Sequence, residues 1–410
     1  MTTELRVLQP SEWNEWFECL ELAFGGVAEP PEQRELDEQL TEHERSIGIW
    51  DGCDVVATAG AFSFRVAVPG GTLVPAAGVT MVSVASTHRR RGLLTSMMRR
   101  QLDDFRALGE PIAVLTASEP VIYGRFGYGA ASRQMSLTID TDRVRLTVPE
   151  GTDEVRLRHA KPDEAMAACE AVYDRLVAGR PGTPAHGPGW ERKPMVDPVS
   201  ARQGGSAQQC VLAELNGQIV GYVTYHIKPE WEPSGPKGQV KVNDLAALDP
   251  AAYAALWRFL FEIDLTSTID ARNRPVDDAV LHLVSDVRRC NILIRDCLHV
   301  RLVELGAALE ARSYRGPLDV VFEVEDAFCP WNAGRWRLTA DAKGAATCRR
   351  TEDPADLALS VRELGSAYLG GESLSSLGLA GRVQELRAGA LAEASSAFLS
   401  DTAPWLPRGF

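Results

Sequence analysis

The chain has 410 residues, of which 45% are hydrophobic and 24% charged, and its formal net charge is −13. This composition is typical of a globular protein with two or three domains. The acidic balance argues against a nucleic-acid partner, because phosphate backbones are bound by a broad basic face. No apolar stretch reaches the roughly 18 residues of a membrane span, and the acidic N-terminal residues do not fit a signal peptide. We therefore expect no membrane partner and a cytoplasmic location.

The first 150 residues predict a mixed α/β domain. Trp13, Phe17, Leu20 and Phe24 recur at helical spacing, and an acidic helical segment follows them. Asp51-Gly52 is a dipeptide typical of a hairpin turn. Strands are expected at 47–50, 55–64, 74–84 and 112–115, with a helix over 93–108 that ends at Gly109.

A basic turn joins the strand that ends at Val84 to the helix that begins at Leu93. It reads His88-Arg89-Arg90-Arg91-Gly92. The first N–H groups of a helix have no intrahelical partner and carry partial positive charge. Gly92 lets the backbone approach a phosphate, and arginines bind phosphate oxygens. We expect a pyrophosphate site of the kind that acyl-coenzyme A occupies; a solvated basic turn is the alternative.

A second copy of this element order begins near residue 155. Strands at 210–214 and 219–226 flank the turn Asn216-Gly217, and a strand at 239–245 leads to a helix over 251–263. The arginines and the glycine are missing, and Asp249 before Pro250 suits a helix start but repels pyrophosphate. We interpret this unit as a degenerate, structural copy. A chance similarity between α/β domains is the alternative.

From about residue 298 the pattern becomes that of an α+β domain. Apolar positions alternate over 299–311, and Gly370-Gly371 marks a break. We expect strands at 318–324, 335–338, 345–349 and 357–360, and helices at 361–368 and 386–399.

The cysteines and histidines do not predict a metal centre. The eight cysteines include no CxxC pair, and the seven histidines show no HxxxH or HExxH spacing. Cys290 and Cys297 are spaced as possible neighbours on a helix, but two cysteines are too few for a metal site. We expect no metal and reduced, mostly buried thiols.

One segment is far more specific than the basic turn. It runs from Ala117 to Gly129 and reads ASEPVIYGRFGYG. Together with 87–94, the segment 364–371 and the terminal Phe410, it resembles the enhanced intracellular survival (Eis) family of actinobacterial GNAT N-acetyltransferases. The basic turn also resembles the GNAT coenzyme A signature, with Leu94 where that signature has Gly or Ala.

The resemblance implies an α+β fold of tandem GNAT-like domains followed by a sterol-carrier-protein-like α+β domain. The corresponding boundaries are 1–150 for a catalytic GNAT domain, 151–297 for a degenerate one and 298–410 for the C-terminal domain. It also implies acetyl-CoA as cosubstrate and a homohexamer built as a dimer of trimers.

The resemblance further implies that Tyr123 is the general acid and the terminal carboxylate of Phe410 the general base. A tyrosine with a reference pKa near 10 can return a proton to a thiolate. The alternatives are that Tyr123 is an aromatic residue that only packs against its neighbours, and that Phe410 belongs to a frayed terminus. The implied cofactor contacts are Val82, Ser83, Val84, Arg89, Arg90, Arg91, Gly92, Leu93, Leu94, Thr95, Ser118 and Glu119.

The acceptor is less well defined. Family members that acetylate aminoglycosides have an acidic residue before the terminal Phe, where this chain has Gly409 after Arg408. Glu29, Glu32 and Glu35 either bind a cationic acceptor or form a solvated helix face. We expect an N-acetyltransferase acting on amines of a polycationic, aminoglycoside-like small molecule. The alternatives are a polyamine or protein-lysine acetyltransferase, and a non-catalytic acyl-CoA or lipid-binding protein.

Overall fold

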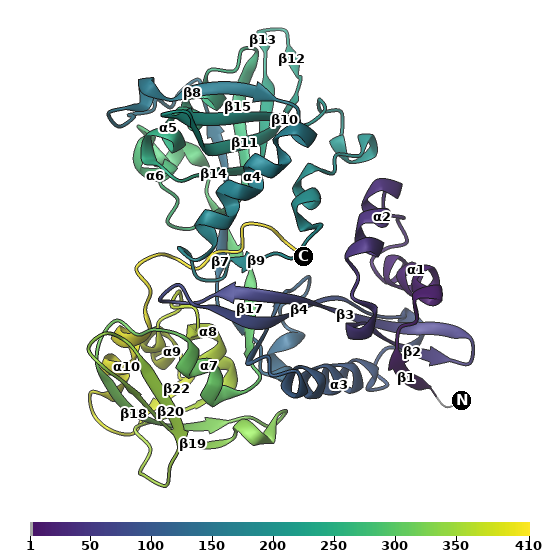
Figure 1. The fold of residues 1–410 in the computed structure, drawn as a ribbon, viewed down its shortest axis with the longest axis vertical. Coiled ribbons are helices and arrows are strands. Elements are labelled where there is room, and N and C mark those ends of the chain that lie inside the picture. The colour runs from purple at the N-terminus through teal and green to yellow at the C-terminus, as the bar shows by residue number, and fades with distance from the viewer. Residues whose placement is uncertain (1–2) are drawn as a thin grey trace.

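A computed structural model describes residues 3–410, which form three units, each built around a β-sheet (Figure 1). Within these residues, no helix is long and apolar enough to cross a membrane. All eight cysteines lie among them, and seven are buried, as predicted; Cys53 is exposed. Cys290 and Cys297 do not share a helix, because Cys290 ends a short 3-10 turn and Cys297 directly precedes a strand.

The first sheet has the strand order β1-β2-β3-β4-β5-β17-β6, with β9 beside β3. Only β4 and β5 are parallel neighbours within it. Its strands are β1 (Glu4–Val7), β2 (Ile47–Asp51), β3 (Asp54–Ala67), β4 (Leu73–Val84), β5 (Ile112–Thr116), β6 (Gly129–Ala130), β9 (Pro184–Ala185) and β17 (Leu298–Leu302).

Helices cover both faces of this sheet. On one face lie α1 (Trp13–Ala23) and α2 (Pro31–Leu40), and on the other lies α3 (Leu93–Ala107) (Figure 1). The apolar stripe of α1 runs through Trp13 and Phe17 as expected. Phe24, which we expected in that stripe, lies beyond the end of the helix and is 62% exposed.

The second sheet repeats the order of the first. Read from one edge it is β8-β10-β11-β14-β15-β7-β16, and its one parallel pair is β14 with β15. Helix α4 was not predicted from the sequence. The elements are β7 (Arg133–Asp140), β8 (Arg156–Ala160), α4 (Pro162–Val177), β10 (Gln209–Leu215), β11 (Gln218–Lys228), the hairpin β12 (Trp231–Glu232) and β13 (Gly235–Pro236), β14 (Gly238–Ala247), α5 (Pro250–Phe261), β15 (Thr266–Pro275), α6 (Val280–Leu283) and β16 (Leu293–Asp296).

The first two sheets exchange a strand. β7 follows β6 closely in the chain but joins the second sheet, and β17 follows β16 but returns to the first. β7 thus precedes the proposed boundary at 150/151 but belongs to the second sheet, and β17 follows the one at 297/298 but belongs to the first. The apolar pattern of a strand shows that it is buried, but it does not specify which neighbouring sheet edge it pairs with. As a result, two crossing segments join the units covalently.

The third unit contains the sheet β20-β19-β18-β21-β22 and four helices. The alternating pattern over 299–311 splits into β17 and α7 instead of forming one element. α8 packs tightly on the first sheet, because a Cβ at Gly129 would overlap the backbone of α8. The elements are α7 (Leu305–Ala311), β18 (Leu318–Glu325), β19 (Gly334–Ala340), β20 (Ala346–Arg350), β21 (Leu357–Ser360), α8 (Val361–Ala367), α9 (Leu374–Leu379), β22 (Val383–Glu385) and α10 (Ala390–Phe398).

Candidate active site

The central strands of the first sheet separate part of the way along their length. β4 and β5 pair in parallel from Ala76 to Gly78, opposite Ile112 to Val114. Beyond Gly78, β4 stays with β3 as far as Val84, whereas β5 follows β17. Met81 has a φ of +53°, and the register of β4 against β3 shifts beside it. Such a bulge bends the strand, so the ends of β4 and β5 diverge next to the N-terminus of α3.

The N-terminus of α3 is free to bind an anion. Gly92 precedes the helix with a φ of +83°, and among residues 3–410 no side chain caps the first turn. The side chains of Arg89, Arg90 and Arg91 are exposed and make no ion pair or hydrogen bond to any described residue. The predicted cofactor contacts Val82, Ser83 and Val84 end β4, directly before this turn, and Leu93, Leu94 and Thr95 begin α3.

Two further contacts support this turn and were missed in the sequence. His88 Nε2 lies 3.2 Å from a carboxylate oxygen of Asp51, which ties the turn to the end of β2. The Ser83 hydroxyl lies 2.7 Å from the hydroxyl of Thr58 on β3. The predicted contacts Ser118 and Glu119 are exposed in the loop that follows β5, on the other side of the strand separation.

Tyr123 begins a short 3-10 turn, Tyr123–Phe126, on the α3 side of the sheet. Its ring lies edge-on to that of Tyr128, with 6.0 Å between centroids. Burial, and then the negative charge of Glu119, raise the pKa of the Tyr123 hydroxyl above its ordinary value. The hydroxyl is therefore protonated at neutral pH and available as a proton donor.

A buried ion pair supports the loop that carries Tyr123. Gly127 closes the turn with a φ of +85°, and a Cβ at this position would lie 2.8 Å from the guanidinium of Arg301. Arg301 is fully buried and forms two hydrogen bonds, of 2.7 and 2.9 Å, with Asp326 of the third unit. The glycine at 127 therefore meets both a conformational and a steric requirement.

The chain end lies on the opposite face of the first sheet, where the three units meet (Figure 1). The Phe410 ring packs against Phe64 of β3, and its Cε2 lies 3.4 Å from the position of a Cβ on Gly78. The tail is hydrogen-bonded along its length, since the Trp405 N–H donates to Pro181 and the Asn273 amide donates to the carbonyl of Pro407. A frayed terminus, the alternative for Phe410, does not describe this arrangement.

Arg408 fixes the tail to the second unit. Its guanidinium lies 2.6 Å from Glu170 of α4 and 3.3 Å from Asp244 of β14, and it donates to the Tyr222 hydroxyl at 3.0 Å. It also lies 4.1 Å from the centroid of the Tyr173 ring. In the sequence, residues 408–409 stand out only as a departure from the family pattern. A lone arginine in an otherwise apolar tail was the available signal for a buried ionic anchor.

Aromatic and ionisable residues from two units surround the Phe410 side of the sheet. Trp190 packs on Phe62 and Phe64, with centroid separations of 4.8 and 5.0 Å. Burial raises the pKa of Asp37 on α2 and lowers the pKa of Lys193; neither residue was singled out in the sequence.

The three glutamates suggested as acceptor contacts differ in their surroundings. Glu32 lines a cavity of about 510 Å³ between α2 and the segment 192–202. Burial raises the pKa of Glu29. Glu35 is exposed and accepts a hydrogen bond from Gln39.

The second unit has no equivalent anion cradle. The side chain of Asp249 caps α5 and accepts hydrogen bonds from the N–H groups of Ala251 and Ala252, at 2.8 and 3.1 Å. Pro250 has no N–H group, so the first turn is already satisfied. Within residues 3–410, no group of three or more metal-binding side chains is arranged to hold an ion.

Two parallel strands of the first sheet separate beside a helix whose start is uncapped and flanked by arginines. This arrangement is typical of acyltransferases of the GNAT class. Family models described as an acetyltransferase (GNAT) domain match residues 4–131 and again 186–302. A model described as a sterol carrier protein domain matches residues 305–407. The tandem GNAT-like domains and the sterol-carrier-like α+β domain are thus confirmed.

Whole-chain relatives refine this assignment. An uncharacterized N-acetyltransferase of Streptomyces avermitilis is 68% identical over 410 residues and covers all of both chains. The N-acetyltransferase Eis of Mycobacterium bovis is 34% identical and covers 86% of this chain and 85% of its own. The crystal structure of Eis1 from Mycobacterium abscessus matches with a TM-score of 0.84 and 33% identity over all of both chains. The chain is an N-acetyltransferase that belongs to the Eis family of GNAT enzymes.

Proposed function

We propose that the protein transfers the acetyl group of acetyl-CoA to an amine of a polycationic, aminoglycoside-like small molecule. Tyr123 serves as general acid and the carboxylate of Phe410 as general base. The observation that carries this proposal is that both residues adjoin the point where β4 leaves β5. Phe410 contacts Gly78 from one face of the sheet, and Tyr123 packs on the cluster around Val79 on the other.

Acetyl-CoA supplies an activated acyl thioester, and three segments of this chain are suited to hold it. The free N–H groups of α3 and the arginines at 89–91 suit its pyrophosphate. The backbone at 82–84 and the loop at Ser118 and Glu119 flank the path that its pantetheine arm would take between β4 and β5.

The two proposed catalytic residues act on protons at different atoms. The Phe410 carboxylate takes a proton from the acceptor amine as the amine nitrogen bonds to the acyl carbon. The Tyr123 hydroxyl gives its proton to the sulfur as the C–S bond breaks. The raised pKa of Tyr123 keeps it protonated until that step.

A cationic acceptor is supported by the acidic groups on the Phe410 side. Glu29 precedes α2, Asp37 lies on that helix, and, after burial, the negative charge of Asp37 contributes to the raised pKa of Glu29. Glu32 begins the same helix and lines the cavity of about 510 Å³. A polyamine or a protein lysine carries the same charge and is the second candidate. The hexameric assembly implied by the family resemblance remains a prediction.

Thiol release from acetyl-CoA, measured with aminoglycosides, polyamines and lysine peptides, tests the proposal. Tyr123→Phe should cut turnover on the order of 10²–10⁴-fold with cofactor affinity retained. Tyr128→Phe is the matched control, because it removes a neighbouring hydroxyl that has no hydrogen-bond partner among the described residues. Equal turnover in the two variants would remove Tyr123 from the mechanism. Release with none of the amines would instead favour a non-catalytic acyl-CoA or lipid-binding role.

A further inference from the structure

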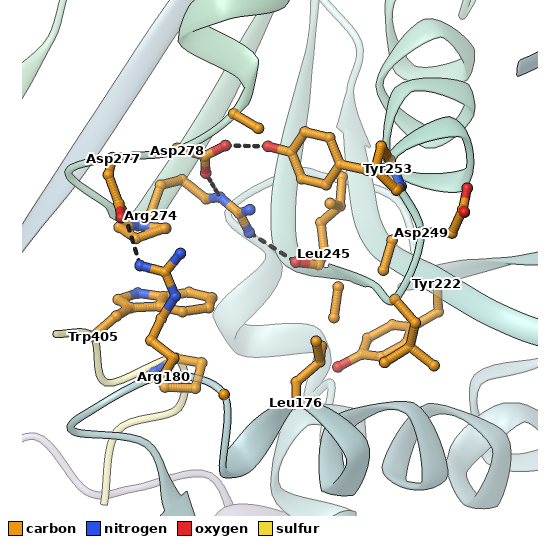
Figure 2. Close-up of a pocket in the computed structure, with 18 of the residues that line it drawn as sticks. Leu176, Arg180, Tyr222, Leu245, Asp249, Tyr253, Arg274, Asp277, Asp278 and Trp405 are labelled. Carbon is orange, nitrogen blue, oxygen red and sulfur yellow. Dashed lines mark hydrogen bonds and ion pairs between the residues drawn. The ribbon is translucent and has the colours of Figure 1, made fainter. Parts of the chain in front are cut away.

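The second unit contains a cavity with a volume of about 820 Å³ (Figure 2). β14 and β15 pair in parallel only as far as Val242 and Ala271, and then separate. The cavity lies beyond that point, between the end of β14, the start of α5 and the segment that follows β15. It therefore occupies the place in the second sheet that the proposed cofactor site occupies in the first.

The walls of this cavity do not suit a charged ligand. Arg274 pairs with Asp278 at 2.6 Å and donates to the carbonyl of Leu245 at 2.9 Å. Arg180 pairs with Asp277 at 2.7 Å, as Figure 2 shows. Of the other charged side chains in the lining, Asp244 faces Arg408, Asp249 accepts hydrogen bonds from the start of α5, and Arg175 is exposed to solvent. Neutralised pairs leave no buried charge for an incoming ion to complement.

The rest of the lining is mainly apolar. Leu176 enters from α4 and Leu245 from β14 (Figure 2), with Leu248 and Leu283 nearby and the Trp405 ring of the tail forming part of the wall. A volume of this size falls within the roughly 300–1,000 Å³ of small-molecule sites. We propose that this cavity binds an uncharged, largely apolar small molecule, and that the bound molecule contacts the C-terminal tail at Trp405.

The contact with Trp405 links the cavity to the chain end. The Trp405 indole donates to the carbonyl of Asn273 at 2.9 Å, and Asn273 in turn donates to the carbonyls of Leu406 and Pro407. A molecule packed on the indole therefore stabilises the same hydrogen bonds that hold the tail. This inference rests on the cavity and on the hydrogen bonds of the tail, and its test uses no acetyl-CoA, so it does not depend on the acetyl-transfer proposal.

The test uses the full chain and N-phenyl-1-naphthylamine, an uncharged dye that fluoresces in apolar surroundings. We expect saturable binding at one site per chain. Leu176→Trp and Leu283→Trp fill the cavity from different elements, and each should weaken binding about tenfold or more. Leu379→Trp is the matched control, since Leu379 is 93% exposed in the third unit; this variant should bind like wild type. Thermal melts identify any variant that is not folded.

A second readout locates the dye. Bound dye should slow amide hydrogen exchange in residues 403–408, and this protection should disappear in the two cavity-filling variants. Binding that is unchanged in both folded cavity variants would place the dye elsewhere, for example in the sterol-carrier-like unit, and would overturn the proposal. Binding without protection of the tail would overturn the contact with Trp405.

Discussion

The rings of Phe410 and Phe64 meet edge to face, with 5.0 Å between their centroids and 65° between their planes. This contact joins the last residue of the chain to β3 of the first sheet. Aromatic pairs in this geometry stabilise by about 0.5–1.5 kcal/mol beyond the area that they bury. The tail that leaves the third unit therefore has a specific destination beside the separating strands.

Gly78 is the residue of β4 against which this aromatic pair is packed. A Cβ at this position would overlap the Phe64 ring and contact Phe410. Gly78→Ala should therefore destabilise the protein by about 1–3 kcal/mol, as overpacking does, and lower acetyl transfer by displacing the tail. Gly60→Ala on β3 is the control, because its Cβ would meet its nearest neighbours at ordinary distances of 3.4 and 3.6 Å. Thermal denaturation and steady-state kinetics measure both effects, and equal stability of the two variants would contradict this account.

Arg408 should be the strongest anchor of the tail. Arg408→Met leaves Glu170 and Asp244 without their common cation, and breaking a buried pair in this way costs about 3–5 kcal/mol. We expect a lower melting temperature and lower turnover on amines, with acetyl-CoA affinity unchanged. Arg349→Met, at an exposed position on β20, is the matched control. If tail protection in hydrogen exchange is the same in both variants, the ion pairs do not hold the tail.

The bridge between Glu170 and Arg408 should be pH dependent. Burial alone raises the pKa of Glu170, but His186, whose Nδ1 lies 3.8 Å from the carboxylate, and the hydrogen bond and charge of Arg408 outweigh it and hold the pKa below its ordinary value of 4.5. A carboxylate with a lowered pKa stabilises the fold above the unfolded value and loses that contribution as the pH falls through the folded value.

Glu170→Gln tests this pH dependence. The gap in melting temperature between wild type and Glu170→Gln should be widest near pH 7 and narrow as the pH falls below 4.5. Glu164→Gln, on the same helix at an exposed position, controls for a general charge effect. A gap that stays constant from pH 7 to pH 3 would show that the charge of Glu170 is not what stabilises the tail.

Acetyl-CoA should bind only through the first unit. Titration calorimetry should give one site per chain, because the first turn of α3 is uncapped whereas Asp249 occupies that of α5. Arg90→Glu combined with Gly92→Asp should abolish this binding by placing two carboxylates at the helix start. Arg349→Glu, which makes the same charge change as Arg90→Glu at an exposed position on β20 of the third unit, should retain it. Two equivalent sites, or binding that survives the double substitution, would contradict the assignment.

The features that the sequence determined are local. The strand that ends at Val84, the turn closed by Gly92 and the helix from Leu93 follow from apolar periodicity and from a glycine that adopts a positive φ. The same reasoning identified Asp249 as a helix cap. These features depend on residues within a few positions of one another, so the order of residues suffices to predict them.

The tertiary structure decided which distant segments meet. We predicted neither β7 nor β17 as a strand from the sequence, and the exchange of these two strands between the sheets is seen only in the sheet topology. Arg408 pairs with Asp244, which lies 164 residues earlier in the chain, and with Glu170, which lies 238 residues earlier. No local pattern therefore indicates that this arginine is buried. The destination of Phe410 and the cavity beside Trp405 likewise arise only when three units pack together. Their energies come from contacts between surfaces that the linear sequence leaves far apart.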